Sequence, residues 1–109
     1  MKMTELISKK YVLQSMELIA DGKTQWVQWD IGGTNNRAII RLEKVYRPDA
    51  QFYLTTGSVA RDDEHLVRHF LHHTADMEEM SAWLRDTGNA DRIIDSLTQL
   101  SNRVDEGFD

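Results

Sequence analysis

The chain has 109 residues, no cysteine, and 18 acidic against 13 basic residues, which gives a formal net charge of −5 at pH 7. This length supplies one domain with one hydrophobic core. The lack of cysteine excludes disulfides, thiolate metal sites and a cysteine nucleophile. No apolar run is long enough for a membrane span, and the first residues lack a signal-peptide pattern. We therefore expect a cytoplasmic protein without membrane contact.

The charge is unevenly distributed along the chain. Residues 1–60 carry eight Lys or Arg and six Asp or Glu, whereas residues 61–109 carry five Arg and twelve acids. An acidic half repels phosphate, so direct binding of nucleic acid is disfavoured. The acidic half either meets a basic surface on another protein or only keeps the protein in solution.

The first half of the chain predicts strands. Residues 11–20 and 23–31 flank Asp21-Gly22, which is a strong signal for a two-residue hairpin turn. Folding at this turn gathers the apolar side chains on one face: Val12, Met16, Leu18, Ala20, Val27, Trp29 and Ile31. Residues 11–20 also fit a helix, because several of their apolar side chains share a helical face. We favour the hairpin.

Two more strands are expected after this hairpin. Gly32 to Asn36 forms a loop of small and polar residues that suits a chain reversal. Arg37 to Tyr46 is a third strand, and residues 47–50 form a turn in which Pro48 fixes φ. Gln51 to Thr56, rich in aromatic and β-branched residues, is a short fourth strand.

The apolar spacing becomes helical near residue 62. Leu66, Val67, Phe70 and Leu71 form a helical stripe that predicts a helix beginning near Asp62 or Asp63. Thr74 or Asp76 caps a second helix, and the spacing of Asp76 and Glu79 fits a capping box. That helix buries Met77, Met80, Trp83 and Leu84 and ends near Gly88. Asn89 caps a last helix that buries Ile93, Leu97, Leu100 and Val104.

These elements predict one α+β domain over residues 1–109. Its sheet is an antiparallel meander of about four strands within residues 11–56. Two or three helices within residues 62–106 pack on one face of that sheet.

Asp30-Ile31-Gly32-Gly33-Thr34-Asn35 resembles the first phosphate-binding turn of the glucokinase and related sugar-kinase family. In that family the glycines let backbone N–H groups approach nucleotide phosphates. The match covers six residues, and those kinases have two large lobes with further nucleotide motifs. We interpret the string as a hairpin loop and expect no cofactor.

All four histidines lie within nine residues. On a helix His65, His69 and His72 would share one face, and imidazoles one turn apart can bind Zn²⁺ or Ni²⁺. The His-Glu-x-x-His signature of metalloproteases is absent. The same face also suits plain solvation, so a metal- or ligand-binding protein centred on these histidines is our alternative hypothesis.

The two tryptophans of residues 23–31 fall on different faces of the predicted sheet. Trp29 faces the core, whereas Trp26 lies on the second face, with Leu13, Ile19, Ile39 and Val45 as expected neighbours. Helices can cover one face of a four-stranded sheet but hardly both. An uncovered face that carries Trp26 would be a contact surface, because large exposed apolar patches usually are.

No catalytic constellation is recognisable, so we expect a non-catalytic protein-binding module. Its expected partner is another protein, with a basic surface as one option, and a homodimer is compatible with the sequence. The expected partner-binding residues are Trp26, Glu78, Glu79, Asp91 and Asp95. The region from Trp83 to Arg103 is similar to the helical end of some small phage anti-CRISPR proteins. That resemblance implies a small inhibitor of phage or mobile-element type. Immunity proteins and small regulators are other binding modules of this kind.

Overall fold

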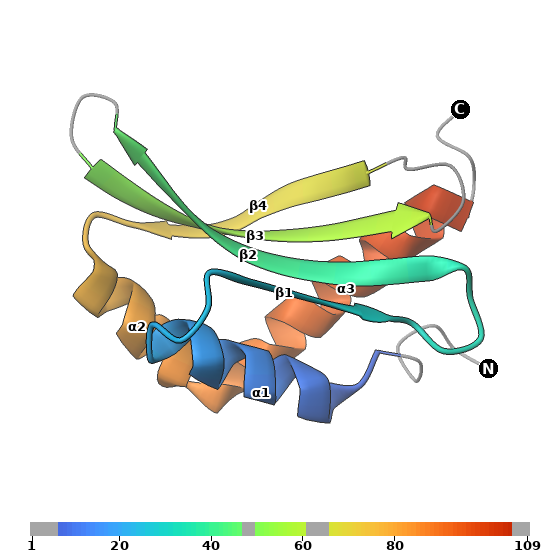
Figure 1. Cartoon of the computed structure of the whole chain (residues 1–109), viewed down its shortest axis with the longest axis horizontal. Helices are drawn as coiled ribbons and strands as arrows, with labels where there is room; N and C mark the ends of the chain where they lie inside the picture. Colours follow the sequence, from blue (N-terminus) through green and yellow to red (C-terminus); the bar gives the residue numbers. More distant parts are fainter. Residues whose placement is uncertain (1–6, 47–49, 61–65, 106–109) are drawn as a thin grey trace.

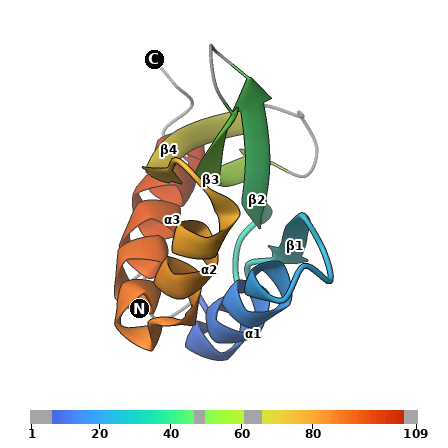
Figure 2. The ribbon, with the colours of Figure 1, turned by 90° about the vertical axis from the view of Figure 1, so that its left-hand side faces the viewer.

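Three α-helices lie on one side of a four-stranded antiparallel sheet (Figure 1). The computed structural model describes residues 7–46, 50–60 and 66–105. Its elements in chain order are α1 (Lys9–Ala20), β1 (Trp26–Asp30), β2 (Asn36–Tyr46), β3 (Ala50–Ala60), β4 (Leu66–Thr74), α2 (Met77–Arg85), the short 3-10 helix η2 (Thr87–Asn89) and α3 (Ala90–Asp105). Figure 2 shows α1 beside β1 and α3 beside β4, toward opposite edges of the helical layer.

The strands follow one another in the order β1-β2-β3-β4, and each is antiparallel to its neighbour. The longest pairing joins β2 to β3, from Asn36 opposite Ala60 to Tyr46 opposite Ala50. The predicted fold class is therefore confirmed: an α+β protein with an antiparallel meander and helices packed on one face.

The predicted hairpin across Asp21-Gly22 is wrong, because residues 9–20 form helix α1. Ser8 caps its start, since the Ser8 hydroxyl accepts a hydrogen bond from the Tyr11 amide. The buried side chains of α1 recur at helical spacing: Val12, Ser15, Met16, Ile19 and Ala20. A hairpin would have placed two of them, Ser15 and Ile19, on the face opposite the core.

Asp21-Gly22 ends this helix instead of forming a hairpin turn. Gly22 has φ of 73°, and its amide donates to the Ile19 carbonyl at 3.1 Å. The Lys23 amide donates to the Leu18 carbonyl at 2.9 Å, which completes a Schellman motif. A glycine at positive φ serves both this motif and a type I′ turn, so the dipeptide alone does not distinguish them.

The predicted helix near residues 62–71 is also wrong where the structure describes it, because Leu66–Thr74 forms strand β4. β3 extends to Ala60, beyond the expected end at Thr56, and β4 pairs along it. A register shift between Leu54 and Thr55 inserts one extra residue into β4 and breaks its two-residue alternation. Residues 47–49 and 61–65, with the expected turn and helix start, lie outside the described residues.

The last two helices agree with the sequence prediction. The Asp76 carboxylate accepts a hydrogen bond from the Glu79 amide at 2.8 Å and so caps α2. Met80 and Leu84 are buried, while Met77 and Trp83 are partly buried against the same core. α3 begins directly after Asn89 and buries its predicted stripe of Ile93, Leu97, Leu100 and Val104.

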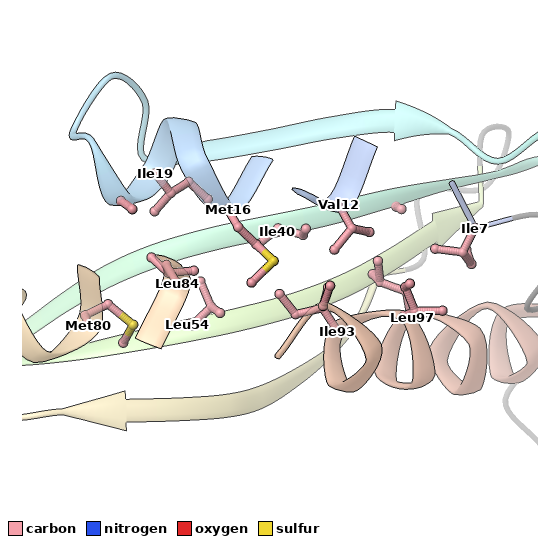
Figure 3. Close-up of a cluster of buried hydrophobic side chains, with 14 of the residues drawn as sticks. Ile7, Val12, Met16, Ile19, Ile40, Leu54, Met80, Leu84, Ile93 and Leu97 are labelled. Atoms are coloured by element: carbon pink, nitrogen blue, oxygen red, sulfur yellow. The ribbon is translucent and has the colours of Figure 1, made fainter. Parts of the chain in front are cut away.

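The core lies between the helices and the sheet, where side chains from α1, α2, α3, β2 and β3 meet (Figure 3). Its largest members are fully buried: Met16, Ile19, Ile40, Leu54, Met80, Leu84, Ile93 and Leu97. Two buried polar contacts fix α3 against the sheet. The hydroxyls of Thr56 and Ser96 lie 2.6 Å apart, and the Asn36 side-chain amide donates to the Ser101 hydroxyl at 2.8 Å.

Two neighbouring residues of α1 test its helical structure. Ile19 has no exposed surface, whereas Leu18 is 39% exposed, and the hairpin would have placed Leu18 in the core instead. We expect Ile19→Ala to lower the free energy of unfolding by about 2–5 kcal/mol because it leaves a cavity. Leu18→Ala should cost less than about 1 kcal/mol. Urea denaturation measures both, and the reverse order would contradict a helical α1.

Candidate functional site

The sheet has a covered face, against which the helices pack, and an open face. Strand alternation and the observed register assign the open face. It carries Trp26, Gln28 and Asp30 of β1; Arg37, Ile39, Arg41, Glu43 and Val45 of β2; Gln51, Tyr53, Thr55, Gly57 and Val59 of β3; and Leu66, Arg68, Phe70 and His73 of β4. No helix of the described residues packs on this face.

Large apolar side chains are exposed on the open face. Trp26 is 50% exposed, Leu66 49% and Phe70 60%. They come from the two edge strands, β1 and β4, so they flank the centre of the sheet from both sides. The sequence predicted this face for Trp26, and it placed Ile39 and Val45 there correctly. Its expected neighbours Leu13 and Ile19 belong to α1 and pack in or against the core instead.

A hollow of about 450 Å³ lies at the centre of the open face. It is lined by Gln25, Trp26, Ile39, Arg41, Thr55, Thr56, Gly57, Leu66 and Arg68. Gly57 forms part of its floor because it lacks a side chain between Ile39 of β2 and Arg68 of β4. A Cβ atom at Gly57 would lie 3.2 Å from Leu66 Cδ1 and would occupy part of this space.

Two arginines at the hollow share one carboxylate. Glu43 Oε1 lies 3.7 Å from Arg41 Nε and 3.5 Å from an Arg68 guanidinium nitrogen. The side chain of Glu43 is 22% exposed, while those of Arg41 and Arg68 are about half exposed. Arg41 and Glu43 lie on β2, whereas Arg68 lies on β4, so only the folded sheet brings Arg68 to this carboxylate.

An aromatic group continues the open face beside the hollow. The Tyr53 ring contacts Phe70 edge-on at 5.8 Å and stacks on His73 at 5.5 Å. Trp29, by contrast, points to the covered face, packs against the core and meets Tyr11 of α1 edge-on at 6.0 Å. The predicted difference between Trp26 and Trp29 is therefore confirmed.

The predicted acidic residues lie on the helical layer, on the other side of the sheet from Trp26. Glu78 and Glu79 are exposed on α2, and Asp91 and Asp95 are exposed on α3. Asp91 lies 3.5 Å from the Lys9 ammonium of α1. One flat partner surface cannot contact both layers, so the structure does not bring the five expected partner-binding residues together.

The histidines do not share a helical face, because they lie on strand β4. His69 Nδ1 is 3.4 Å from the Ser96 hydroxyl of α3, and the His72 ring stacks on Trp83 of α2 at 4.5 Å. His73 points to the open face, and His65 lies outside the described residues. Among the described residues no group of three or more His, Asp or Glu side chains could hold a metal ion.

The loop between β1 and β2 is closed by its own hydrogen bonds. Gly33 has φ of 81°, and the Thr34 hydroxyl donates to the Ile31 carbonyl and accepts from the Asn36 amide. The Ile31 amide donates to the Asn36 carbonyl at 2.9 Å. These bonds explain the small and polar residues of this loop as those of a hairpin connection.

Sequence reasoning missed Gly57, Leu66, Arg68 and Phe70 as parts of the open face. All four depend on the pairing of β3 with β4, whereas residues 66–71 were expected to be helical. One available signal was the stretch Gly57-Ser58-Val59-Ala60, which directly follows the predicted strand and contains no helix-favouring charged residues.

Compared with protein-family models, curated proteins and solved structures, the chain has no match. In the part of the chain that the structure describes, no helix is long and apolar enough to cross a membrane.

The environment of His72 predicts a pH dependence of stability. Burial lowers the pKa of His72 below its ordinary value of 6.5, and the charges of Arg92 and His73 lower this pKa further. The unfolded chain then binds the proton more tightly than the folded chain. The contribution of neutral His72 to the free energy of unfolding is complete above pH 6.5 and is lost as the pH falls through the folded-state pKa of His72.

We expect the free energy of unfolding of the wild type to fall more between about pH 7.5 and about pH 5.5 than that of His72→Gln. Urea denaturation at both pH values measures this difference. An equal loss in the two proteins would contradict the assignment of this pH dependence to His72.

Proposed function

We propose that this protein is a non-catalytic protein-binding module that contacts its partner through the open face of the sheet. One observation carries the proposal: Trp26 and Leu66 are about half exposed where they line a hollow that no described helix covers, and Phe70 is 60% exposed on the same face. Contiguous exposed apolar side chains of this size mark interaction surfaces on proteins. Aromatic residues and arginine are also the types enriched at the energetic centres of interfaces.

The chemistry of the hollow supports binding more than catalysis. Its lining, as far as the described residues form it, contains no His, Asp or Glu, which are the side chains that most often act as general bases. The Thr55 hydroxyl donates to the Arg41 carbonyl at 3.3 Å, so no basic side chain activates it as a nucleophile. The lining can bind a ligand through its shape and through apolar contacts.

The acidic helical layer has a second role in this proposal. Residues 76–105 carry seven acids and three arginines, whereas the open face carries Arg37, Arg41 and Arg68 against Asp30 and Glu43. Exposed charges outside a contact surface change the rate of association more than the lifetime of a complex. The acids on α2 and α3 then steer the approach of the partner or repel unsuitable partners.

Within this class we propose a regulatory role. The protein acts either as an inhibitor or antagonist of phage or mobile-element type, or as an immunity protein. The support for this role is the resemblance of residues 83–103 to the helical end of small anti-CRISPR proteins. We also propose a cytoplasmic location, on the absence of cysteine.

Replacement of Trp26 tests the proposed surface. Partners are captured from a lysate of the source cells with immobilised wild type and Trp26→Ala, and are identified by mass spectrometry. We expect Trp26→Ala to lower the affinity for the specific partner by at least about 2 kcal/mol, through faster dissociation. Its free energy of unfolding should change by less than about 1 kcal/mol, because Trp26 is half exposed.

Two controls accompany this experiment. Tyr46 is 66% exposed and projects from the other face of β2, so Tyr46→Ala removes an equally accessible ring and should leave the affinity unchanged. The combined change of Glu78→Gln with Asp95→Asn should change the rate of association without changing the rate of dissociation. An equal loss of affinity for Trp26→Ala and Tyr46→Ala would argue against a specific role of the open face.

A further inference from the structure

The hollow combines an apolar space with positive charge, and this combination restricts what can occupy it. Trp26, Ile39 and Leu66 supply apolar surface, and Thr55 and Gly57 form a floor without long side chains. Arg41 and Arg68 also line the hollow. A ligand that fills this space therefore needs an apolar part and at least one negative charge nearby.

Among the residues that the structure describes, the charges beside the hollow are incompletely balanced. Arg41 and Arg68 supply two positive charges, and Glu43 supplies one negative charge to both. The distances of 3.7 and 3.5 Å exceed the roughly 2.7–2.9 Å of a strong charge-assisted hydrogen bond. Because each guanidinium has several N–H donors, both arginines retain donors for a second carboxylate.

Other occupants fit these charges less well. Two copies that meet through their open faces would bring Arg37, Arg41 and Arg68 of one copy toward those of the other. Contact between this face and the acidic helices of another copy would be head-to-tail and would produce a ring or a filament instead of a two-fold dimer. A single-stranded nucleic acid needs a row of cations along its backbone, whereas Asp30 and Glu43 interrupt the arginines on this face.

We propose that the hollow binds an apolar side chain from an acidic, extended segment of the partner protein. The apolar side chain lies over Gly57, between Trp26 and Leu66. A neighbouring carboxylate of the same segment accepts hydrogen bonds from Arg41 and Arg68. This inference rests on the proposed function and specifies the chemistry of the partner.

Short synthetic peptides with a fluorescent label test this inference with the protein as it exists. The first peptide has a central leucine flanked by aspartates, the second has asparagines in place of the aspartates, and the third has serine in place of the leucine. Fluorescence polarisation measures the affinities, and amide chemical shifts locate the site. We expect the first peptide to bind about tenfold tighter than either of the others, with saturable shifts at Gly57 and Thr55.

Substitutions in the protein identify the side chains that bind the peptide. Arg41→Gln and Arg68→Gln should each weaken binding of the first peptide by about tenfold. Arg92→Gln, which removes an exposed arginine from α3, is the matched control and should leave binding unchanged. Gly57→Ala should also weaken binding, because its methyl group enters the hollow while only the end of the Leu66 side chain must move. Thermal unfolding confirms that each variant is folded.

The inference is overturned if the asparagine peptide binds as tightly as the aspartate peptide, or if Arg41→Gln and Arg68→Gln bind like the wild type. It is also overturned if shifts map to α2 and α3, or if an oligothymidine binds at Gly57 more tightly than the first peptide. If Trp26→Ala fails to capture the partner but the arginine variants still capture it, the open face is the binding surface and the proposal of an acidic segment is wrong. If all of these variants still capture the partner, both proposals fail.

Discussion

The packing of the helices against one face of the sheet is the constraint on which the rest of the structure depends. Met16 of α1 and Leu97 of α3 meet Ile40 and Leu54 of the central strands, and all four are almost completely buried. Because side chains alternate along a strand, fixing these residues on the covered face fixes their neighbours on the open face. The three helices are short and lie side by side on one layer (Figure 2). The exposure of Trp26 follows directly from this arrangement.

The two layers therefore differ in chemistry as well as in position. The helices present carboxylates to solvent, which costs little free energy and keeps the surface hydrated. The open face presents apolar side chains and arginines around a floor of small residues, with Gly57 at its centre. Large exposed apolar patches on a protein mark sites of interaction. The proposed binding function accounts for this surface with the residues already present.

Sequence patterns predicted the elements with a clear local signal, and they missed one element with an ambiguous local signal and one that depends on distant pairing. The cap at Asp76 and the apolar stripe of α3 were predicted because adjacent residues carry them. Helix α1 was missed because Gly22 at positive φ fits a helix end and a hairpin turn equally well. Strand β4 was missed because its extra residue interrupts the alternation of side chains between the two faces, and its pairing with β3 leaves no local signal. The same difference applies to the candidate site. The place of Trp26 on the open face was predicted, whereas that of Phe70 depends on strand β4, which was not predicted.

The most direct test of the central claim is photo-crosslinking of the intact protein to its partner. A benzophenone amino acid is placed at Phe70 or Gln28 on the open face, or at Glu78 or Asp95 on the helical layer, all of which are exposed. Illumination in cells is followed by measurement of the crosslinked product. The open face as binding surface predicts strong products from positions 28 and 70 and weak ones from positions 78 and 95. Products from the helical positions alone would contradict it.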